Sequence, residues 1–343
     1  MIQKIFTQKV KEAYKEKRRL VAPLMGFPGL QLSGSTVKLA QQNFGEHYKA
    51  LRMLVKKFKP DIIFPLMDLS VEANALGRYT IFPQQDSATV MKQSFNIAEL
   101  TMQKQVNIAY DSRLMGYVET MKLMNIGFSE DVLRGAYVTG PYSLASLIMG
   151  ADDAVMATIL DPEKLTTLCE FTTKKIQEYV RLLIGAGAQI ICILEPSAVM
   201  LGPDQFEQFS SQFVHHINNS VKYTEVATIY HTCGNTMHLI DKMVEAQVDA
   251  ISLDSPEAGV DLPRVAEKVK GEVIIMGNIN PSGNIFKSDP ETVKKDIKEL
   301  LKVMEPFPNF VLSTGCDLPQ ETPIENINTF METGRNYQIK KHN

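Results

Sequence analysis

The hydrophobic positions of this chain fall into short unbroken runs that alternate with longer amphipathic stretches. Each run is rich in β-branched residues and ends in a polar, glycine or proline cluster, a pattern typical of a parallel strand buried on both faces. The runs cover residues 19–27, 61–69, 133–142, 188–197, 224–234, 249–256, 272–281 and 309–319. Helical periodicity marks the stretches at 44–58, 162–186, 203–220, 236–246, 290–304 and 323–336.

Strands that alternate with helices predict an α/β protein. Asp161-Pro162 and Asp289-Pro290 each place a capping residue before a proline, which is a helix-start signal. The strand runs are as many as a (β/α)₈ TIM barrel needs, so one barrel domain over residues 1–343 is favoured over an open sheet. The first 20 residues predict an amphipathic N-terminal helical extension. The stretch 78–132 is longer than one βα unit needs, so we expect an inserted lobe or lid over the barrel mouth.

Residue types that carry chemistry gather where the expected strands end. Active sites of β/α barrels are built at the carboxyl ends of the strands. The candidates at these positions are Asp68, Glu72, Tyr142, Glu195, His231, Cys233, Asp254, Asn278 and Cys316. A rim that served only for packing would not collect so many polar groups, so the sequence predicts an active site here.

The sharpest signal is the pair His231 and Cys233, followed much later by Cys316. Two residues separated by one position on an extended strand point to the same side, so His231 and Cys233 can share one ion. The last strand closes the barrel beside the first, and Cys316 therefore reaches across the mouth. Three protein ligands with one open position describe a catalytic zinc. The alternative is a hydrogen-bonded rim histidine beside two small buried thiols.

Composition and charge narrow the class of protein. The chain has 343 residues, of which 44% are hydrophobic and 22% charged, and a net charge of −3, which argues against nucleic-acid binding. It shows neither the apolar core of a signal peptide nor a long apolar run, so we expect a cytoplasmic protein without a membrane partner. In that compartment its four cysteines are expected to be reduced, with Cys169 and Cys192 in the core.

The ligand set constrains the reaction. Two thiolates neutralise the charge of Zn²⁺, which makes the ion a poor generator of hydroxide. Such a centre can instead bind a third thiolate from a substrate and keep its sulfur nucleophilic at neutral pH. The sequence therefore indicates an enzyme that alkylates sulfur rather than a hydrolase.

The same residues resemble those of a known family, the uroporphyrinogen decarboxylase superfamily, and within it the zinc-dependent methylcobamide:coenzyme M methyltransferases. The resemblance runs through most of the chain. It is carried by stretches 60–61, 73–77, 139–144, 195–196, 201–206, 231–234, 253–254, 276–281, 313–316 and 322–326, with Asp68. It implies a (β/α)₈ fold, a zinc site at His231, Cys233 and Cys316, a corrinoid (methylcobamide) carried by a partner protein, and a thiol acceptor such as coenzyme M.

Two departures argue against tetrapyrrole decarboxylation. Decarboxylases of this superfamily carry an arginine-rich loop after the first strand, whereas residues 26–33 contain no arginine here. They also have a histidine at the position of Cys316. Decarboxylation is therefore a distant alternative. A methyltransferase that loads the corrinoid from a small methylated substrate, and a zinc-stabilised barrel that only docks the corrinoid carrier, also remain open.

The other rim carboxylates each have two interpretations. Asp68 and Glu72 can orient substrate or accept a proton, or they can be helix-start carboxylates favoured by the helix dipole. Glu195 is a candidate fourth zinc ligand that substrate displaces, or the acceptor of a rim hydrogen bond.

The remaining candidates surround the expected metal. Asp254 and Asn278 are expected to orient His231, because metal-bound histidines usually need such a partner. Gly26, Phe27 and Tyr142 are candidate contacts for the corrinoid, although Gly26 and Phe27 are also consistent with a simple turn.

Overall fold

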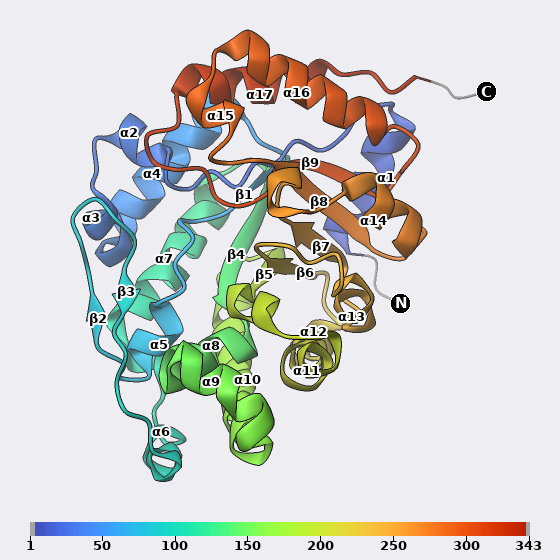
Figure 1. Ribbon diagram of the computed structural model, residues 1–343. Coiled ribbons are helices and arrows are strands. Elements are labelled where there is room, and N and C mark those ends of the chain that lie inside the picture. Colours follow the sequence, from blue (N-terminus) through green and yellow to red (C-terminus); the bar gives the residue numbers. More distant parts are fainter. Residues whose placement is uncertain (1–3, 341–343) are drawn as a thin grey trace.

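A curled parallel sheet forms the centre of the molecule, and helices cover its outer side (Figure 1). The computed structural model describes residues 4–340. The strands of the sheet, in their spatial order, are β1 (Ile62–Ile63), β4 (Leu133–Thr139), β5 (Ile190–Leu194), β6 (Ala227–Thr232), β7 (Ala250–Leu253), β8 (Ile274–Ile279) and β9 (Phe310–Thr314). Every neighbouring pair is parallel, and the spatial order follows the chain. The predicted α/β class and the positions of these strands are therefore confirmed.

The run expected to form a strand at 19–27 is much shorter than predicted. It contributes one parallel bridge, between Val21 and Leu312 of β9. Backbone hydrogen bonds nevertheless join this segment to both edges of the sheet, from Ala22 N to Leu312 O (2.9 Å) and from Asp61 N to Val21 O (3.1 Å). Pro23 has no N–H with which to extend the ladder, and Leu24 N donates to the side chain of Thr314 instead.

Helices connect successive strands and pack outside the sheet (Figure 1). Those that fall on predicted stretches are α4 (Phe44–Phe58), α10 (Pro162–Gly185), α11 (Pro203–Phe206) continued by α12 (Gln212–Val221), α13 (Ile240–Glu245), α16 (Pro290–Val303) and α17 (Ile324–Asn336). A π-helical turn at Glu207–Ser211 joins α11 to α12. Outside residues 78–132, the helices that sequence periodicity did not indicate are α2 (Gly29–Ser33), α3 (Val37–Gln42), α5 (Val71–Ala75), α8 (Pro141–Met149), α9 (Ala151–Leu160), α14 (Leu262–Val269) and α15 (Asn284–Lys287).

The core has an inner and an outer part. Inside the curled sheet, side chains such as Phe64, Tyr137, Cys192 and Ile229 pack together. Helix α1 (Ile5–Lys15) packs against this inner cluster through Phe6 and Val10. The outer part lies between the strands and the surrounding helices. This arrangement leaves the carboxyl ends of the strands as the place where side chains of several strands meet.

The stretch 78–132 contains a small antiparallel hairpin, β2 (Thr80–Ile81) with β3 (Thr89–Val90), and two short 3₁₀ turns around α6 (Leu100–Gln103). It ends in α7 (Ser112–Gly127), which packs on α4 and on β4. The second part of this stretch therefore belongs to the helical layer around the sheet. Whether the first part serves as a lid stays a prediction.

Within residues 4–340, no single helix is both long enough and apolar enough to cross a membrane. Helices α8 and α9 meet that criterion only as a pair, and the pair is bent by 108°.

Candidate metal centre

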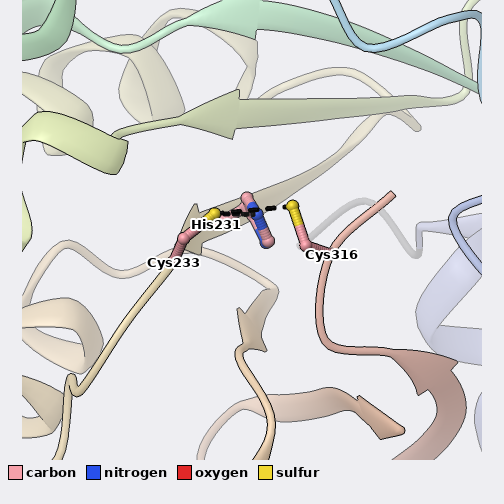
Figure 2. A group of neighbouring side chains, drawn as sticks. All are labelled: His231, Cys233 and Cys316. Carbon is pink, nitrogen blue, oxygen red and sulfur yellow. Dashed lines mark hydrogen bonds between the residues drawn. The ribbon is translucent and has the colours of Figure 1, made fainter. Parts of the chain in front are cut away.

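Three side chains converge at the carboxyl ends of β6 and β9 (Figure 2). His231 is in β6, Cys233 follows it, and Cys316 lies just beyond β9. One ligand atom from each residue lies within 4.8 Å of the others. His231 Nε2 is 3.2 Å from Cys233 Sγ, and the two sulfurs are 3.5 Å apart. The three residues that the sequence singled out are thus brought together.

The spacing of these atoms fits a tetrahedral zinc. Zinc binds thiolate sulfur at about 2.3 Å and imidazole nitrogen at about 2.0–2.1 Å, so tetrahedral angles separate two sulfurs by about 3.8 Å and nitrogen from sulfur by about 3.6 Å. The observed separations of 3.5 and 3.2 Å are within a few tenths of an ångström of these values. Two thiols and one imidazole are also donors that zinc prefers.

A glycine lies beside each cysteine and shapes the loop that carries it. Gly234 follows Cys233 and has φ of +84°, a conformation that side chains rarely adopt. Gly315 precedes Cys316, and a Cβ at this position would lie 2.8 Å from Ser255 N. The close contact between the loops after β7 and β9 therefore requires a residue without a side chain, and it sets the position of Cys316.

The Cys316 thiol favours its protonated form. The hydrogen bond with Cys233, together with burial, raises the pKa of the Cys316 thiol well above its usual value. Zinc binds thiolate rather than thiol, so loading the site must release protons.

His231 is oriented by a residue that the sequence did not indicate. Its Nδ1 lies 3.0 Å from Ser252 Oγ in β7. When Nδ1 carries the proton and donates to Ser252, Nε2 keeps its lone pair free for a metal. The one available signal was that Ser252 is a polar residue inside the otherwise apolar strand Ala250–Leu253.

Asp254 and Asn278 act on the loops rather than on His231. Asp254 accepts hydrogen bonds from Gly234 N (2.7 Å) and Ser255 N (2.6 Å). Asn278 donates to the carbonyl of Asp254 at 2.8 Å. Neither residue makes the expected contact with the imidazole. Asp254 supports the backbone that follows Cys233, whereas Asn278 supports the loop after β7.

We predict that Ser252→Ala weakens zinc binding roughly 10–100-fold, since removal of such a partner typically has that effect on metal affinity. Competition with a chromophoric chelator measures the change. Ser211→Ala is the matched control, because Ser211 is also buried but its hydroxyl donates to the carbonyl of Lys242. Equal zinc affinity in the two variants would remove Ser252 from the account.

A second residue missed from the sequence is Asp317, which follows Cys316. Its carboxylate accepts hydrogen bonds from Gly26 N (3.1 Å) and Met67 N (3.4 Å). Burial raises the pKa of Asp317 to about 7. The side chain ties the loops after β1 and β9 to the segment containing Gly26, so Gly26 has a structural contact next to the site. Phe27 lies at a half-buried position nearby.

Glu195 does not join the metal cluster. Its carboxylate accepts hydrogen bonds from Tyr142 N (3.0 Å), Ser143 N (2.8 Å) and Ser210 Oγ (3.0 Å). Burial raises its pKa to about 7. These contacts occupy both carboxylate oxygens. Of the two interpretations of Glu195, they correspond to the acceptor of hydrogen bonds at the rim rather than to a fourth zinc ligand. Tyr142 is fully buried at the first turn of α8, so its ring offers no exposed surface to a corrinoid in this conformation.

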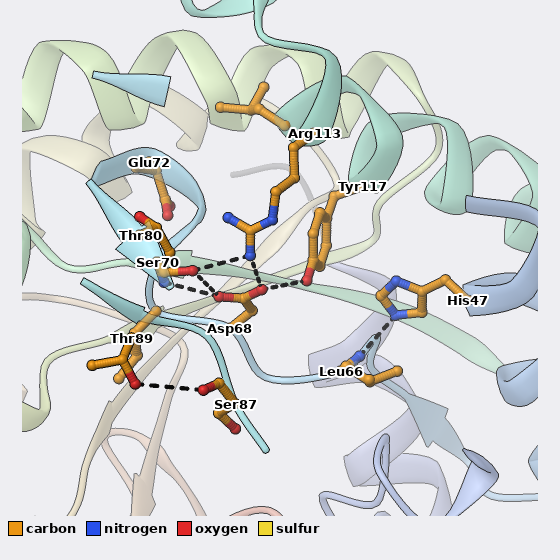
Figure 3. A network of polar contacts seen from close by, with 12 residues as sticks. His47, Leu66, Asp68, Ser70, Glu72, Thr80, Ser87, Thr89, Arg113 and Tyr117 are labelled. Carbon is orange, nitrogen blue, oxygen red and sulfur yellow. Dashed lines mark hydrogen bonds and ion pairs between the residues drawn. The ribbon is translucent and has the colours of Figure 1, made fainter. Parts of the chain in front are cut away.

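Asp68 and Glu72 are both engaged in buried contacts (Figure 3). Asp68 forms an ion pair with Arg113 and accepts hydrogen bonds from Tyr117 (2.7 Å) and Ser70 (2.6 Å). Glu72 accepts hydrogen bonds from the backbone and hydroxyl of Thr139 (2.7 and 2.9 Å). The structure therefore brings these carboxylates next to α7 and β4, outside the group of metal ligands.

A curled parallel sheet with a candidate metal site at the carboxyl ends of its strands defines a TIM-barrel-like α/β protein. The family model for uroporphyrinogen decarboxylase (URO-D) matches residues 34–337, and the chain belongs to this family. The resemblance predicted from the sequence is thereby confirmed.

Relatives of known type include methyltransferases and decarboxylases. The chain is 27% identical over 278 residues to the methylcobamide:CoM methyltransferase MtbA of Methanosarcina mazei, covering 79% of this chain and 78% of that protein. The MtbA of Methanosarcina acetivorans is also 27% identical, over 64% of this chain and 63% of that protein, which is less than two thirds of its length. A uroporphyrinogen decarboxylase of Prochlorococcus marinus is 23% identical over 81% of this chain and 80% of that protein.

A solved methyltransferase from Methanosarcina mazei has the same fold, with a TM-score of 0.84 at 19% identity over 92% of this chain and 93% of that chain. The relatives confirm the prediction of an enzyme, of the kind to which the MtbA methyltransferases belong.

Proposed function

We propose that this protein is a zinc-dependent methyltransferase that moves a methyl group between a corrinoid-carrying protein and a thiol acceptor such as coenzyme M. The observation that carries the proposal is the cluster of His231 Nε2, Cys233 Sγ and Cys316 Sγ at zinc-like spacing. Zinc bound there would hold the acceptor thiol as a thiolate that stays nucleophilic at neutral pH. Similarity to the two MtbA proteins supports the same reaction class.

The roles of the protein's own residues follow from their contacts. His231, Cys233 and Cys316 would bind the ion, and Ser252 would fix the tautomer of His231. Asp254 would hold the turn after Cys233. The carboxylates of Asp68, Glu72 and Glu195 are satisfied by donors of the protein, which supports a role in positioning the strand ends and helices around the site.

The positions of the positively charged side chains support decarboxylation less well than methyl transfer. The segment 26–33, which forms α2 and the turn before it, contains no arginine. Arg113 is buried and paired with Asp68. A substrate with many carboxylates needs arginine or lysine side chains that remain available to bind it.

We predict that the purified protein contains about one zinc per chain, as expected for one three-ligand site, and consumes methylcobalamin only when a thiol such as 2-mercaptoethanesulfonate is present. Metal analysis and the loss of methylcobalamin absorbance measure both. Consumption of methylcobalamin that is unchanged after zinc removal would contradict the proposal. Decarboxylation of a porphyrinogen by the metal-free protein would favour the alternative.

A further inference from the structure

Tyr137 is a buried tyrosine of β4 whose hydroxyl has no hydrogen-bond partner among residues 4–340. Only 7% of the residue is exposed. A buried hydroxyl without a partner is costly, and native proteins leave few of them. Such a group therefore needs an explanation, and one explanation is a ligand that supplies the missing acceptor.

The Tyr137 ring is fixed in place inside the curled sheet. It stacks on Phe64, with ring centroids 4.8 Å apart and an interplanar angle of 19°. Phe64 in turn lies over Gly135, where a Cβ would come within 2.2 Å of the Phe64 ring. The stack and the missing side chain at position 135 hold the ring in one orientation, so its hydroxyl is presented to one region.

That region is next to the metal centre. Tyr137 is paired in register with Cys192 of β5, two positions before Leu194, which pairs with His231. Side chains two positions apart on a strand share a face, so Tyr137 points to the same inner side of the sheet as His231. In register it lies two residues closer to the amino ends of the strands. After burial itself, the neighbours that raise the pKa of Tyr137 are Asp317, Cys192, Cys316 and Cys233. These neighbours include both cysteines of the candidate metal centre.

The hydroxyl can act only as a donor to such an acceptor. Burial raises the pKa of Tyr137 well above its usual value, so the phenol keeps its proton throughout the neutral range. A protonated phenol in a site that collects sulfur anions is suited to donate a hydrogen bond to one of them.

We propose that the Tyr137 hydroxyl is a positioning group that donates a hydrogen bond to the sulfur of the thiol acceptor. The inference rests on the proposed function, because it requires a thiolate beside His231, Cys233 and Cys316. The Tyr137 hydroxyl, which has no partner within the described residues, would then have its acceptor in the substrate. Specificity for an acceptor that carries an anionic sulfur then depends partly on Tyr137.

The substitution Tyr137→Phe tests this directly, since it removes only the hydroxyl and keeps the stack on Phe64. We expect unchanged zinc content, an unchanged or higher thermal midpoint, and binding of the probe 2-mercaptoethanol that is weaker by roughly tenfold or more. Calorimetric titration of the zinc-loaded full chain measures the affinity. The unusual combination of equal or greater stability with weaker thiol binding distinguishes a substrate contact from a structural one.

Tyr230→Phe is the matched control. Tyr230 is also fully buried, but its hydroxyl lies 2.6 Å from Ser210 Oγ and its ring packs on Phe206, on the helical side of β6. We expect a lower thermal midpoint and unchanged thiol affinity for this variant. Wild-type thiol affinity in Tyr137→Phe, or a loss of stability like that of Tyr230→Phe, would overturn the assignment of Tyr137 alone. Failure of the zinc-loaded wild-type protein to bind the thiol would overturn the proposed function as well.

Discussion

Replacing Cys233 or Cys316 by alanine is expected to lower the bound zinc from about one ion per chain to less than about a tenth of that, and to abolish thiol-dependent methyl transfer. Each substitution leaves one thiolate and one imidazole, which is fewer than the three protein ligands typical of catalytic zinc sites. A single remaining thiolate also neutralises only half of the charge of Zn²⁺. Metal analysis after dialysis against a weak chelator measures the loss.

Cys169→Ala provides the control for these substitutions. Cys169 is fully buried in α10, and burial raises the pKa of its thiol well above the usual value, so it is not available as a ligand. This variant should keep zinc and activity at the wild-type level. Zinc retained by Cys233→Ala and Cys316→Ala at that same level would show that the ion is bound elsewhere.

The second large effect is expected at the buried ion pair between Asp68 and Arg113. Arg113 lies on α7 with its guanidinium 4.7 Å from the Phe82 ring, and Asp68 follows β1 (Figure 3). We predict that Arg113→Met lowers the free energy of unfolding by about 3–5 kcal/mol, because it leaves a carboxylate buried without its counter-charge. Urea unfolding followed by circular dichroism measures the difference.

An exposed ion pair on the same helix supplies the comparison. Lys122 and Glu119 are 2.6 Å apart, with 49% and 38% of their side chains exposed. Lys122→Met should change the free energy of unfolding by less than about 1 kcal/mol. The double substitution Asp68→Asn with Arg113→Met should recover part of the loss, since no buried charge is then left unpaired. If Arg113→Met and Lys122→Met were equally mild, the ion pair would have no structural role.

Much of the fold follows from the pattern of apolar residues. Buried parallel strands need unbroken apolar runs, and each run after residue 60 contains a strand of the sheet, although the run at 61–69 contributes only Ile62–Ile63. Helix α4 has the predicted bounds, Phe44–Phe58, because an amphipathic stretch there is capped by Asn43 and ends at Lys59 in the left-handed conformation. Helix α7 escaped prediction because its buried residues are spread around it and include Arg113 and Thr120 as well as apolar side chains.

The candidate site was predictable only where its residues are close in the sequence or chemically distinctive. His231, Cys233 and Cys316 have side chains that few structural roles require on a barrel rim. Ser252 gives only the weak signal of a polar residue in an apolar strand, and a serine in a strand is common. Asp317 bonds to Gly26, which is 291 positions away, so its role depends on the closed arrangement of the strands.

X-ray absorption at the zinc edge, with and without thiol, tests the central claim most directly. We predict two sulfurs and one histidine nitrogen from the protein, as in the cluster of His231, Cys233 and Cys316. Addition of a competent thiol should bring a third sulfur into the zinc shell and release about one proton per site near neutral pH, because free thiols titrate near pH 8.5. Binding of that thiol with neither a new zinc–sulfur contact nor proton release would contradict the account.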